Sequence, residues 1–305
     1  MPRMIDRREF LQLTAGLSLA GLLPVNVYGQ QKLPVRGIPG STEQLPVIGL
    51  GSTKPVMLIP QVGTQPLYEV IRMLVDAGGK VIDTAPRTEA IDREFGLVLQ
   101  DPRWREALFV SAKINSPVKQ AGLDQLQQTR QLFARQTLDL VQIESMVDID
   151  THWTSLQEAK SKGTARYIGV TVANTGAHDQ LESFMRRAKP EFIQVNYSVG
   201  ETQAGARILP LAAELGIAVQ INRPFMNGEY FQKTKSRELP DWAAEFDCTS
   251  WAQFSLKYIL AHPAVTCVLT ETTNPEHMRD NLQAAFGPLP DTTMQARMRA
   301  YIESI

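Results

Sequence analysis

Short apolar runs rich in β-branched residues recur along the chain, with helical patterns between them. In those intervals apolar residues repeat every three or four positions, which places them on one face of a helix. Runs that are apolar on both faces and alternate with amphipathic helices predict a parallel sheet covered by helices. There are eight such runs: Pro46–Leu50, Lys80–Asp83, Leu108–Lys113, Leu138–Ile143, Arg166–Thr171, Glu191–Val195, Ile217–Ile221 and Val265–Leu269.

Eight strand–helix units predict the α/β class and, within it, a (β/α)8 TIM barrel. Such a barrel typically takes about 250 residues, and the chain has 305. A doubly wound sheet is the competing fold, but Gly49-x-Gly51 after the first run lacks the third glycine of a dinucleotide-binding turn. The polar interval Met226–Asp247 predicts a large loop over the barrel mouth, and Thr292–Ile302 predicts a closing helix that lies on the barrel.

The first 29 residues have the pattern of an export signal. Arg7-Arg8 precede Phe10-Leu11, and the apolar stretch Leu13–Leu23 is too short to span a bilayer. This order resembles a twin-arginine signal; an amphipathic N-terminal helix is the other interpretation. We expect residues 1–29 to be a signal peptide that contacts the twin-arginine translocase, and residues 30–305 to form one barrel domain. The mature protein is then periplasmic, or otherwise exported, without a stable membrane anchor.

Charge and composition narrow the classes of ligand. The chain has 31 basic and 32 acidic residues, so it offers no electrostatic surface for nucleic acid. Its four histidines lack ligand spacing and two cysteines cannot form a four-thiolate zinc site, so no metal is expected. Cys248 and Cys267 either pair in an oxidising compartment or, as the apolar run around Cys267 favours, remain small buried hydrophobes.

Polar residues stand where the predicted strands end, which is where barrels of this kind carry their chemistry. Asp83 and Lys113 end neighbouring strands, and Glu144 ends the next one. An Asp and a Lys in these places predict a buried ion pair. Position alone leaves open whether that pair is catalytic or structural.

Several segments resemble the aldo/keto reductase family in order and spacing. The resemblance covers about residues 45–291 and implies transfer of hydride between NAD(P)H and a carbonyl group, without a metal. The family uses an Asp, a Tyr, a Lys and a His at the barrel mouth. The segments are Ile82–Pro86, Phe109–Lys113, Asp139–Ile143, Arg166–Val170, Ile193–Tyr197 and Asn274–His277 with Asp280-Asn281.

The resemblance assigns the catalytic positions only in part. Asp83 and Lys113 occupy the Asp and Lys positions, while Thr88 stands in place of the Tyr and Glu144 in place of the His. An aliphatic hydroxyl is a much weaker acid than a phenol, so Thr88 is a poor proton donor. Family members that reduce conjugated double bonds carry Glu at the His position.

The resemblance also implies a set of cofactor-binding positions. Gln194 is expected on the nicotinamide carboxamide, Asn222 replaces the ring that stacks on nicotinamide, and Arg223 offers a cation to the pyrophosphate. Glu271 and His277 stand at the cationic positions for a 2′-phosphate, so NAD(H) is expected to bind better than NADP(H). The full set is Thr171, Gln194, Asn222, Arg223, Glu271, His277, Asp280 and Asn281.

Two functional hypotheses follow. In the first, the chain is an NAD(P)H-linked oxidoreductase that acts on a small carbonyl or conjugated substrate, with Glu144 as the acid beside Lys113. In the second, it is a barrel that has lost redox chemistry and binds a small-molecule ligand. The missing Tyr, the missing stacking ring and the absence of an NAD(P)H pool outside the cytoplasm favour the second hypothesis. The first is favoured by the retained cofactor positions and by twin-arginine export, which carries folded proteins, often with a cofactor already bound.

Overall fold

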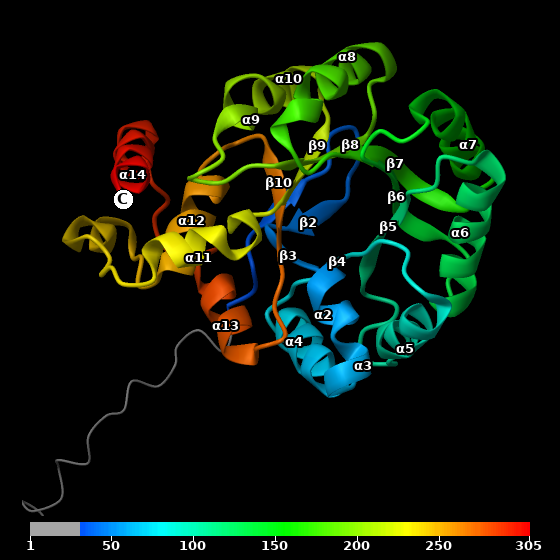
Figure 1. Cartoon of the computed structure of the whole chain (residues 1–305), viewed down its shortest axis with the longest axis horizontal. Helices are drawn as coiled ribbons and strands as arrows, with labels where there is room; N and C mark the ends of the chain where they lie inside the picture. Colours follow the sequence, from blue (N-terminus) through cyan, green and yellow to red (C-terminus); the bar gives the residue numbers. More distant parts are fainter. Residues whose placement is uncertain (1–30) are drawn as a thin grey trace, which may run out of the picture. The chain divides into compact units, whose positions relative to one another are not determined.

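The computed structural model describes residues 31–305 and confirms the predicted barrel, as Figure 1 shows. Eight parallel strands close on themselves in the order β10-β3-β4-β5-β6-β7-β8-β9. Each predicted run contains or overlaps one strand of the barrel. The strands are β3 (Ile48–Gly51), β4 (Val81–Asp83), β5 (Phe109–Ile114), β6 (Leu138–Glu144), β7 (Ala165–Thr171), β8 (Phe192–Asn196), β9 (Ala218–Asn222) and β10 (Val265–Thr270).

Helices follow the strands and surround the barrel (Figure 1). Their apolar faces pack on the outer side of the strands and make the larger of two hydrophobic clusters. The helices are α2 (Thr53–Met57), α3 (Ile59–Val62), α4 (Gln65–Asp76), α5 (Glu89–Leu99), α6 (Lys119–Leu132), α7 (Ile149–Ser161), α8 (His178–Ala188), α9 (Gln203–Ala206), α10 (Ile208–Leu215), α11 (Glu229–Thr234), α12 (Trp251–Leu260), α13 (Pro275–Gln283) and α14 (Thr292–Ser304), with short 3₁₀ turns η2 (Thr175–Ala177), η3 (Met226–Gly228) and η4 (Asp241–Phe246).

A two-stranded antiparallel hairpin, β1 (Val35–Gly37) with β2 (Gln44–Pro46), closes the end of the barrel where the strands begin. Arg36 donates hydrogen bonds to backbone carbonyl oxygens just before and at the start of β10. Glu43 pairs with Lys80 just before β4 and with Arg166 at the start of β7. These contacts at three strands hold the hairpin across the barrel end.

The barrel interior changes character along its axis. Next to the hairpin it is filled by a second hydrophobic cluster that includes Phe109, Leu140 and Phe192. Nearer the carboxyl ends of the strands, buried polar side chains such as Gln142 and Gln220 replace these apolar ones. The apolar layer therefore closes the interior from below and leaves the polar layer facing the mouth.

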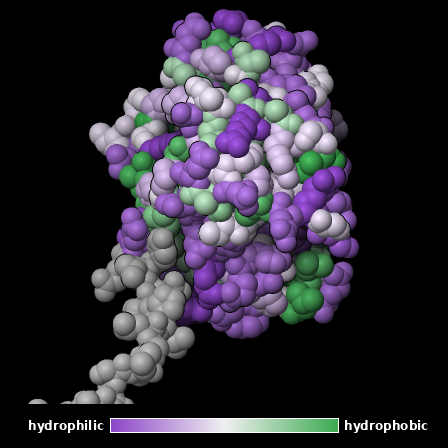
Figure 2. Space-filling view, turned by 90° about the vertical axis from the view of Figure 1, so that its left-hand side faces the viewer, coloured by the Kyte–Doolittle hydropathy of each residue, from purple (hydrophilic) through white to green (hydrophobic). Residues whose placement is uncertain are grey.

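The interval Met226–Asp247 is more ordered than the loop that its polarity predicts, because it contains η3, α11 and η4. The closing helix α14 packs on α12 and η4: Tyr301 contacts Trp242 and stacks on Trp251. Figure 2 shows this side of the molecule, where hydrophilic side chains cover most of the surface.

Two sequence expectations concern the compartment and the thiols. Residues 1–29, the expected signal peptide, lie outside the described residues. Cys248 and Cys267 are free and buried, and Cys267 packs inside the barrel with the apolar cluster. None of the helices in residues 31–305 has the length and apolar character needed to cross a membrane.

Candidate active site

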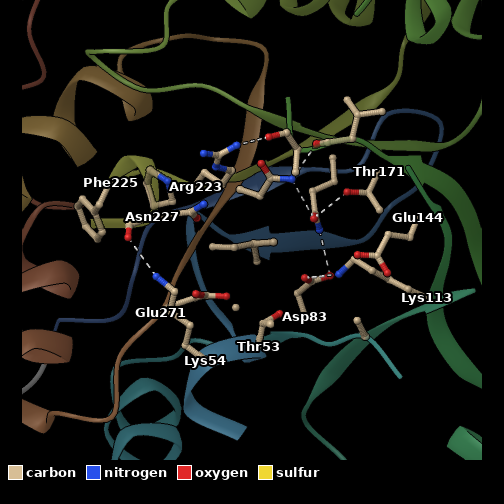
Figure 3. A pocket seen from close by; sticks show the side chains of 18 of the residues that line it. Thr53, Lys54, Asp83, Lys113, Glu144, Thr171, Arg223, Phe225, Asn227 and Glu271 are labelled. Atoms are coloured by element: carbon tan, nitrogen blue, oxygen red, sulfur yellow. Dashed lines mark hydrogen bonds and ion pairs between the residues drawn. The ribbon is translucent and has the colours of Figure 1, made fainter. Parts of the chain in front are cut away.

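A cavity of about 600 Å³ opens at the carboxyl ends of the strands. Every barrel strand contributes a residue at or near its carboxyl end, and Glu271 follows just beyond β10. The loop after β9 forms one side of the mouth (Figure 3). Lining residues include Gly51, Lys54, Asp83, Lys113, Glu144, Thr171, Gln194, Asn222, Arg223, Phe225, Asn227, Phe231 and Glu271.

Asp83 and Lys113 form the ion pair that their positions predict. Lys113 Nζ donates to Asp83 Oδ2 at 2.5 Å and also lies 3.4 Å from the Thr84 carbonyl oxygen. Only 6% of the Asp83 surface and 5% of the Lys113 surface is exposed. An ion pair this deeply buried is costly to break, because either partner alone is left as an uncompensated charge.

Gln194 connects this ion pair to the opposite side of the barrel. Its Nε2 donates to Asp83 Oδ1 at 3.0 Å, and its Oε1 accepts from Thr171 Oγ1 at 2.9 Å. Asn222 Nδ2 also donates to the Gln194 Oε1, at 3.2 Å, and to the Val172 carbonyl oxygen at 2.9 Å. The amide of Gln194 is therefore engaged at both ends by side chains of the barrel itself.

Glu144 is half-buried and faces the cavity from the end of β6, next to the strand of Lys113 (Figure 3). Glu144 and Lys113 therefore line the same cavity. The chain turns sharply after Glu144, because Ser145, Met146 and Asp148 have φ values of 53°, 58° and 39°. Left-handed backbone at non-glycine residues is strained and collects at functional sites.

The loop after β9 is tied across the cavity mouth. Arg223, itself at φ 51°, donates from Nη1 to the Ala173 carbonyl oxygen after β7 at 2.5 Å. Lys54 Nζ in α2 donates to the Asn227 carbonyl oxygen of the same loop at 3.1 Å. Two cationic side chains, Arg223 and Lys54, thus stand at the rim of the cavity.

Glu271 lies on the cavity wall beyond β10. Although much of its side chain faces the cavity, burial by the surrounding walls raises the pKa of Glu271 above its usual value. The Lys54 charge opposes this shift and the Asp83 charge adds to it. Glu271 therefore interacts electrostatically with the Asp83–Lys113 pair. The sequence placed Glu271 beside a 2′-phosphate and did not predict this interaction.

Four residues predicted for the site do not line the cavity: Thr88, His277, Asp280 and Asn281. Thr88 is exposed at the residue before α5, so its hydroxyl does not replace the missing phenol. His277 is exposed on α13, and Asn281 is buried in the same helix. Asp280 accepts hydrogen bonds from Ser250 and Gln253, each at 2.6 Å, and so joins α13 to α12.

Arg87, one residue before Thr88, has a side chain that is only 6% exposed, which the sequence motif did not reveal. It donates to the Ser52 carbonyl oxygen at 3.0 Å and to Thr84 Oγ1 at 2.8 Å, and it pairs with Asp92 at 3.4 Å. Burial lowers the pKa of Arg87, and the nearby carboxylates partly offset this. Arg87 thereby ties the loop after β3 to the loop after β4, directly beside Asp83.

Comparison with known proteins decides the family. The model of the aldo/keto reductase family matches residues 48–302, which is most of the chain. The chain belongs to the aldo/keto reductase family.

This aldo/keto reductase is similar to the NADH-specific methylglyoxal reductase of Escherichia coli (strain K12), with 26% identity over 195 residues. The match covers 50% of this chain and 59% of that relative. Among solved structures, an aldo/keto reductase from Klebsiella pneumoniae in complex with NADP and acetate superposes with a TM-score of 0.72, at 18% identity over 89% of this chain and 95% of that one. The holo form of an aldo-keto reductase from Bacillus halodurans superposes with a TM-score of 0.69, at 18% identity over 89% and 96%. At these identities the structural likeness shows the fold alone.

Proposed function

We propose that this aldo/keto reductase is an NAD(P)H-linked oxidoreductase that acts on a small molecule with a carbonyl group or a conjugated double bond. One observation carries the proposal. The buried Asp83–Lys113 pair and the Glu144 carboxyl line the same 600 Å³ cavity at the barrel mouth. A charged lysine and a carboxyl on one cavity wall supply the electrostatic and proton-transfer functions that carbonyl reduction needs.

The residues of the cavity fit a nicotinamide nucleotide. Lys54 and Arg223 at the rim offer cationic partners to a pyrophosphate, and Thr171 and Gln194 line the floor. Asn222 offers an amide where a stacking ring is usual in the family, so the nicotinamide side of the site relies on polar contacts. The bound nucleotide would supply the hydride.

The chain's own residues would handle charge and proton. Lys113, held by Asp83, places a positive charge where the substrate oxygen becomes negative during reduction. Glu144, which faces the same cavity, would act as the acid that gives a proton to that oxygen, or to carbon in a conjugated substrate. The substrate carbon would receive the hydride, and the Glu144 carboxylate would then take up a proton from solvent, so that one hydride and one proton are consumed per turnover.

Glu144→Gln tests this assignment. We expect kcat to fall by about 10²–10⁴, the usual contribution of a general acid, while nucleotide affinity stays within twofold. Turnover is followed by NADH absorbance and affinity by fluorescence titration. Glu303→Gln, an exposed carboxylate on α14, is the matched control and should leave both unchanged. Unchanged kcat in Glu144→Gln would refute the role of Glu144 as acid.

The second candidate function is a ligand-binding barrel without redox activity. Two observations favour it: Thr88 is outside the cavity, and the amide of Gln194 is engaged internally at both ends. A purified protein that takes up neither NADH nor NADPH would support this alternative and contradict the oxidoreductase.

For the nucleotide we propose a preference for NADH. Glu271 puts a carboxylate on the cavity wall, and a like-charged 2′-phosphate near it costs binding free energy. The Escherichia coli relative is described as NADH-specific, and the Klebsiella pneumoniae structure holds NADP. Equal or tighter binding of NADPH in the fluorescence titration would contradict the preference.

A further inference from the structure

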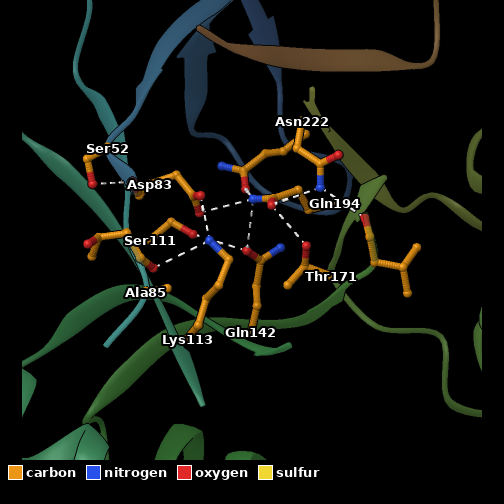
Figure 4. Close-up of polar contacts among 12 residues, drawn as sticks. Ser52, Asp83, Ala85, Ser111, Lys113, Gln142, Thr171, Gln194 and Asn222 are labelled. Atoms are coloured by element: carbon orange, nitrogen blue, oxygen red, sulfur yellow. Dashed lines mark hydrogen bonds and ion pairs between the residues drawn. The ribbon is translucent and has the colours of Figure 1, made fainter. Parts of the chain in front are cut away.

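Three glutamines lie inside the barrel directly beneath the cavity. Gln142 in β6, Gln194 in β8 and Gln220 in β9 are at most 2% exposed. Gln194 Nε2 lies 3.3 Å from Gln142 Oε1 and 3.4 Å from Gln220 Oε1, as well as 3.0 Å from Asp83 Oδ1. Figure 4 shows Gln194 between Asp83 and Gln142. Gln142 Oε1 also accepts from Ser111 Oγ at 3.2 Å.

The chemistry of Asp83 sets the orientation of all three amides. The ionised carboxylate that pairs with Lys113 only accepts hydrogen bonds, so Gln194 has to turn its N–H2 group toward it. One N–H bond of Gln194 then points to Asp83, and the other is shared by the oxygens of Gln142 and Gln220. Sharing one hydrogen between two acceptors accounts for the longer distances of 3.3 and 3.4 Å.

This orientation leaves polar groups unsatisfied. Gln142 Nε2 and Gln220 Nε2 are buried and have no hydrogen-bond partner. Unsatisfied buried N–H groups destabilise a fold, and an apolar side chain of the same length avoids that cost. Buried polar groups without partners tend to occur at functional sites. In Gln142 and Gln220 the side-chain oxygen has a hydrogen-bond partner and the nitrogen does not.

We propose that Gln142 and Gln220 are positioning residues, whose carbonyl oxygens hold Gln194 against Asp83. They act through Gln194, which in turn fixes the carboxylate that pairs with Lys113. Gln142 is opposite Lys113 across β5 and β6, and Gln220 is opposite Gln194 across β8 and β9. The support therefore reaches the ion pair from both sides of the barrel. This inference rests on the proposed function for its effect on rate, but not for its effect on Gln194.

The test replaces both glutamines by a residue of similar length that has no acceptor oxygen, in Gln142→Met/Gln220→Met. We expect the side-chain amide hydrogens of Gln194, assigned by their loss in Gln194→Met, to exchange with water at least tenfold faster by NMR. We expect kcat to fall about tenfold with nucleotide affinity within twofold, and Gln194→Met to add little to that loss in the triple variant. Such non-additivity identifies residues that act through one another. If the double variant does not fold, the same measurements are made on Gln142→Met and Gln220→Met separately.

Ser155→Ala is the matched control. Ser155 is a buried polar residue of the outer helix α7 whose Oγ donates to the Thr151 carbonyl oxygen, so Gln194 exchange and kcat should not change. Unchanged Gln194 exchange in the double variant would overturn the proposal. Faster exchange with unchanged kcat would overturn the positioning role. A wild-type protein with no turnover would contradict the proposed function, and amide exchange alone would then decide whether the glutamines hold Gln194.

Discussion

Asp83 compensates the charge of Lys113 in an environment almost closed to water. In Asp83→Asn the ammonium would remain buried without its counter-charge. We expect this variant to lose about 3–5 kcal/mol of unfolding free energy, the scale measured when one partner of a buried pair is removed. Urea unfolding at neutral pH measures the loss.

The double variant Asp83→Asn/Lys113→Met separates charge from packing. Because it leaves no buried charge behind, we expect it to be more stable than Asp83→Asn alone. A double variant that loses the sum of the two single losses would show that the pair stabilises the barrel by contacts other than charge.

Glu271 gives a prediction for pH. Its pKa is raised in the folded protein by burial, so folding favours its protonated form. That stability is present at low pH and is lost as pH rises through the raised pKa. Glu271→Gln should therefore be more stable than the wild type at pH 7, by less than about 1 kcal/mol because the cavity admits water. The difference should vanish below about pH 4, where the carboxyl is neutral in both states.

Chemical denaturation of both proteins from pH 4 to 8 checks this sign. Glu303→Gln on the exposed surface of α14 should show no comparable trend. A Glu271→Gln variant that is less stable than the wild type at pH 7 would show that the ionised carboxylate stabilises the fold, for example through Lys54.

At the scale of elements, α5 and α6 approach closely at Gly96. A Cβ atom placed there would lie 2.2 Å from the Leu132 carbonyl oxygen at the end of α6. Gly96→Ala therefore has to push the two helices apart, and we expect a loss of about 1–3 kcal/mol in urea unfolding. Leu97→Ala, at an exposed position of the same helix, should change stability by less than about 0.5 kcal/mol. Equal effects of the two changes would contradict the close approach.

The barrel strands were predictable because each is apolar on both faces and is followed by an amphipathic helix. The β1–β2 hairpin was not, because its strands have three residues each and are held by the side-chain contacts of Arg36 and Glu43 with distant parts of the chain. At the site, Asp83 and Lys113 were predictable because they stand at the carboxyl ends of predicted strands. The motif could not show that the chain turns Arg87 inward and Thr88 outward, because that depends on Ser52 and Asp92 as partners. The alternation of inward and outward residues along β6 could have pointed to Gln142, two positions before Glu144.

At the scale of the whole molecule, the remaining prediction is that the protein is exported by the twin-arginine route. Replacing Arg7-Arg8 by Lys-Lys keeps the charge and removes the side chains that a twin-arginine translocase recognises. We expect the variant to stay in the cytoplasm, as measured by cell fractionation and immunoblotting. Replacing Arg3 by Lys is the control and should not affect export. Periplasmic variant protein at the wild-type level would refute the signal assignment.

The hairpin at the closed end of the barrel also has a consequence for the order in which ligands bind and dissociate. The β1–β2 hairpin and the apolar layer around Phe109 and Phe192 fill that end of the barrel. In the described part of the chain, a ligand therefore reaches the cavity floor through the mouth. Two ligands that use the same entrance must bind in a fixed order. The ligand at the cavity floor binds first and dissociates last. A nucleotide bound as proposed, with its nicotinamide at Gln194 on the floor, would bind before the substrate, and its oxidised form would leave last. We expect steady-state kinetics to show competitive inhibition between the two forms of the nucleotide, and no binding of a carbonyl substrate to the nucleotide-free protein.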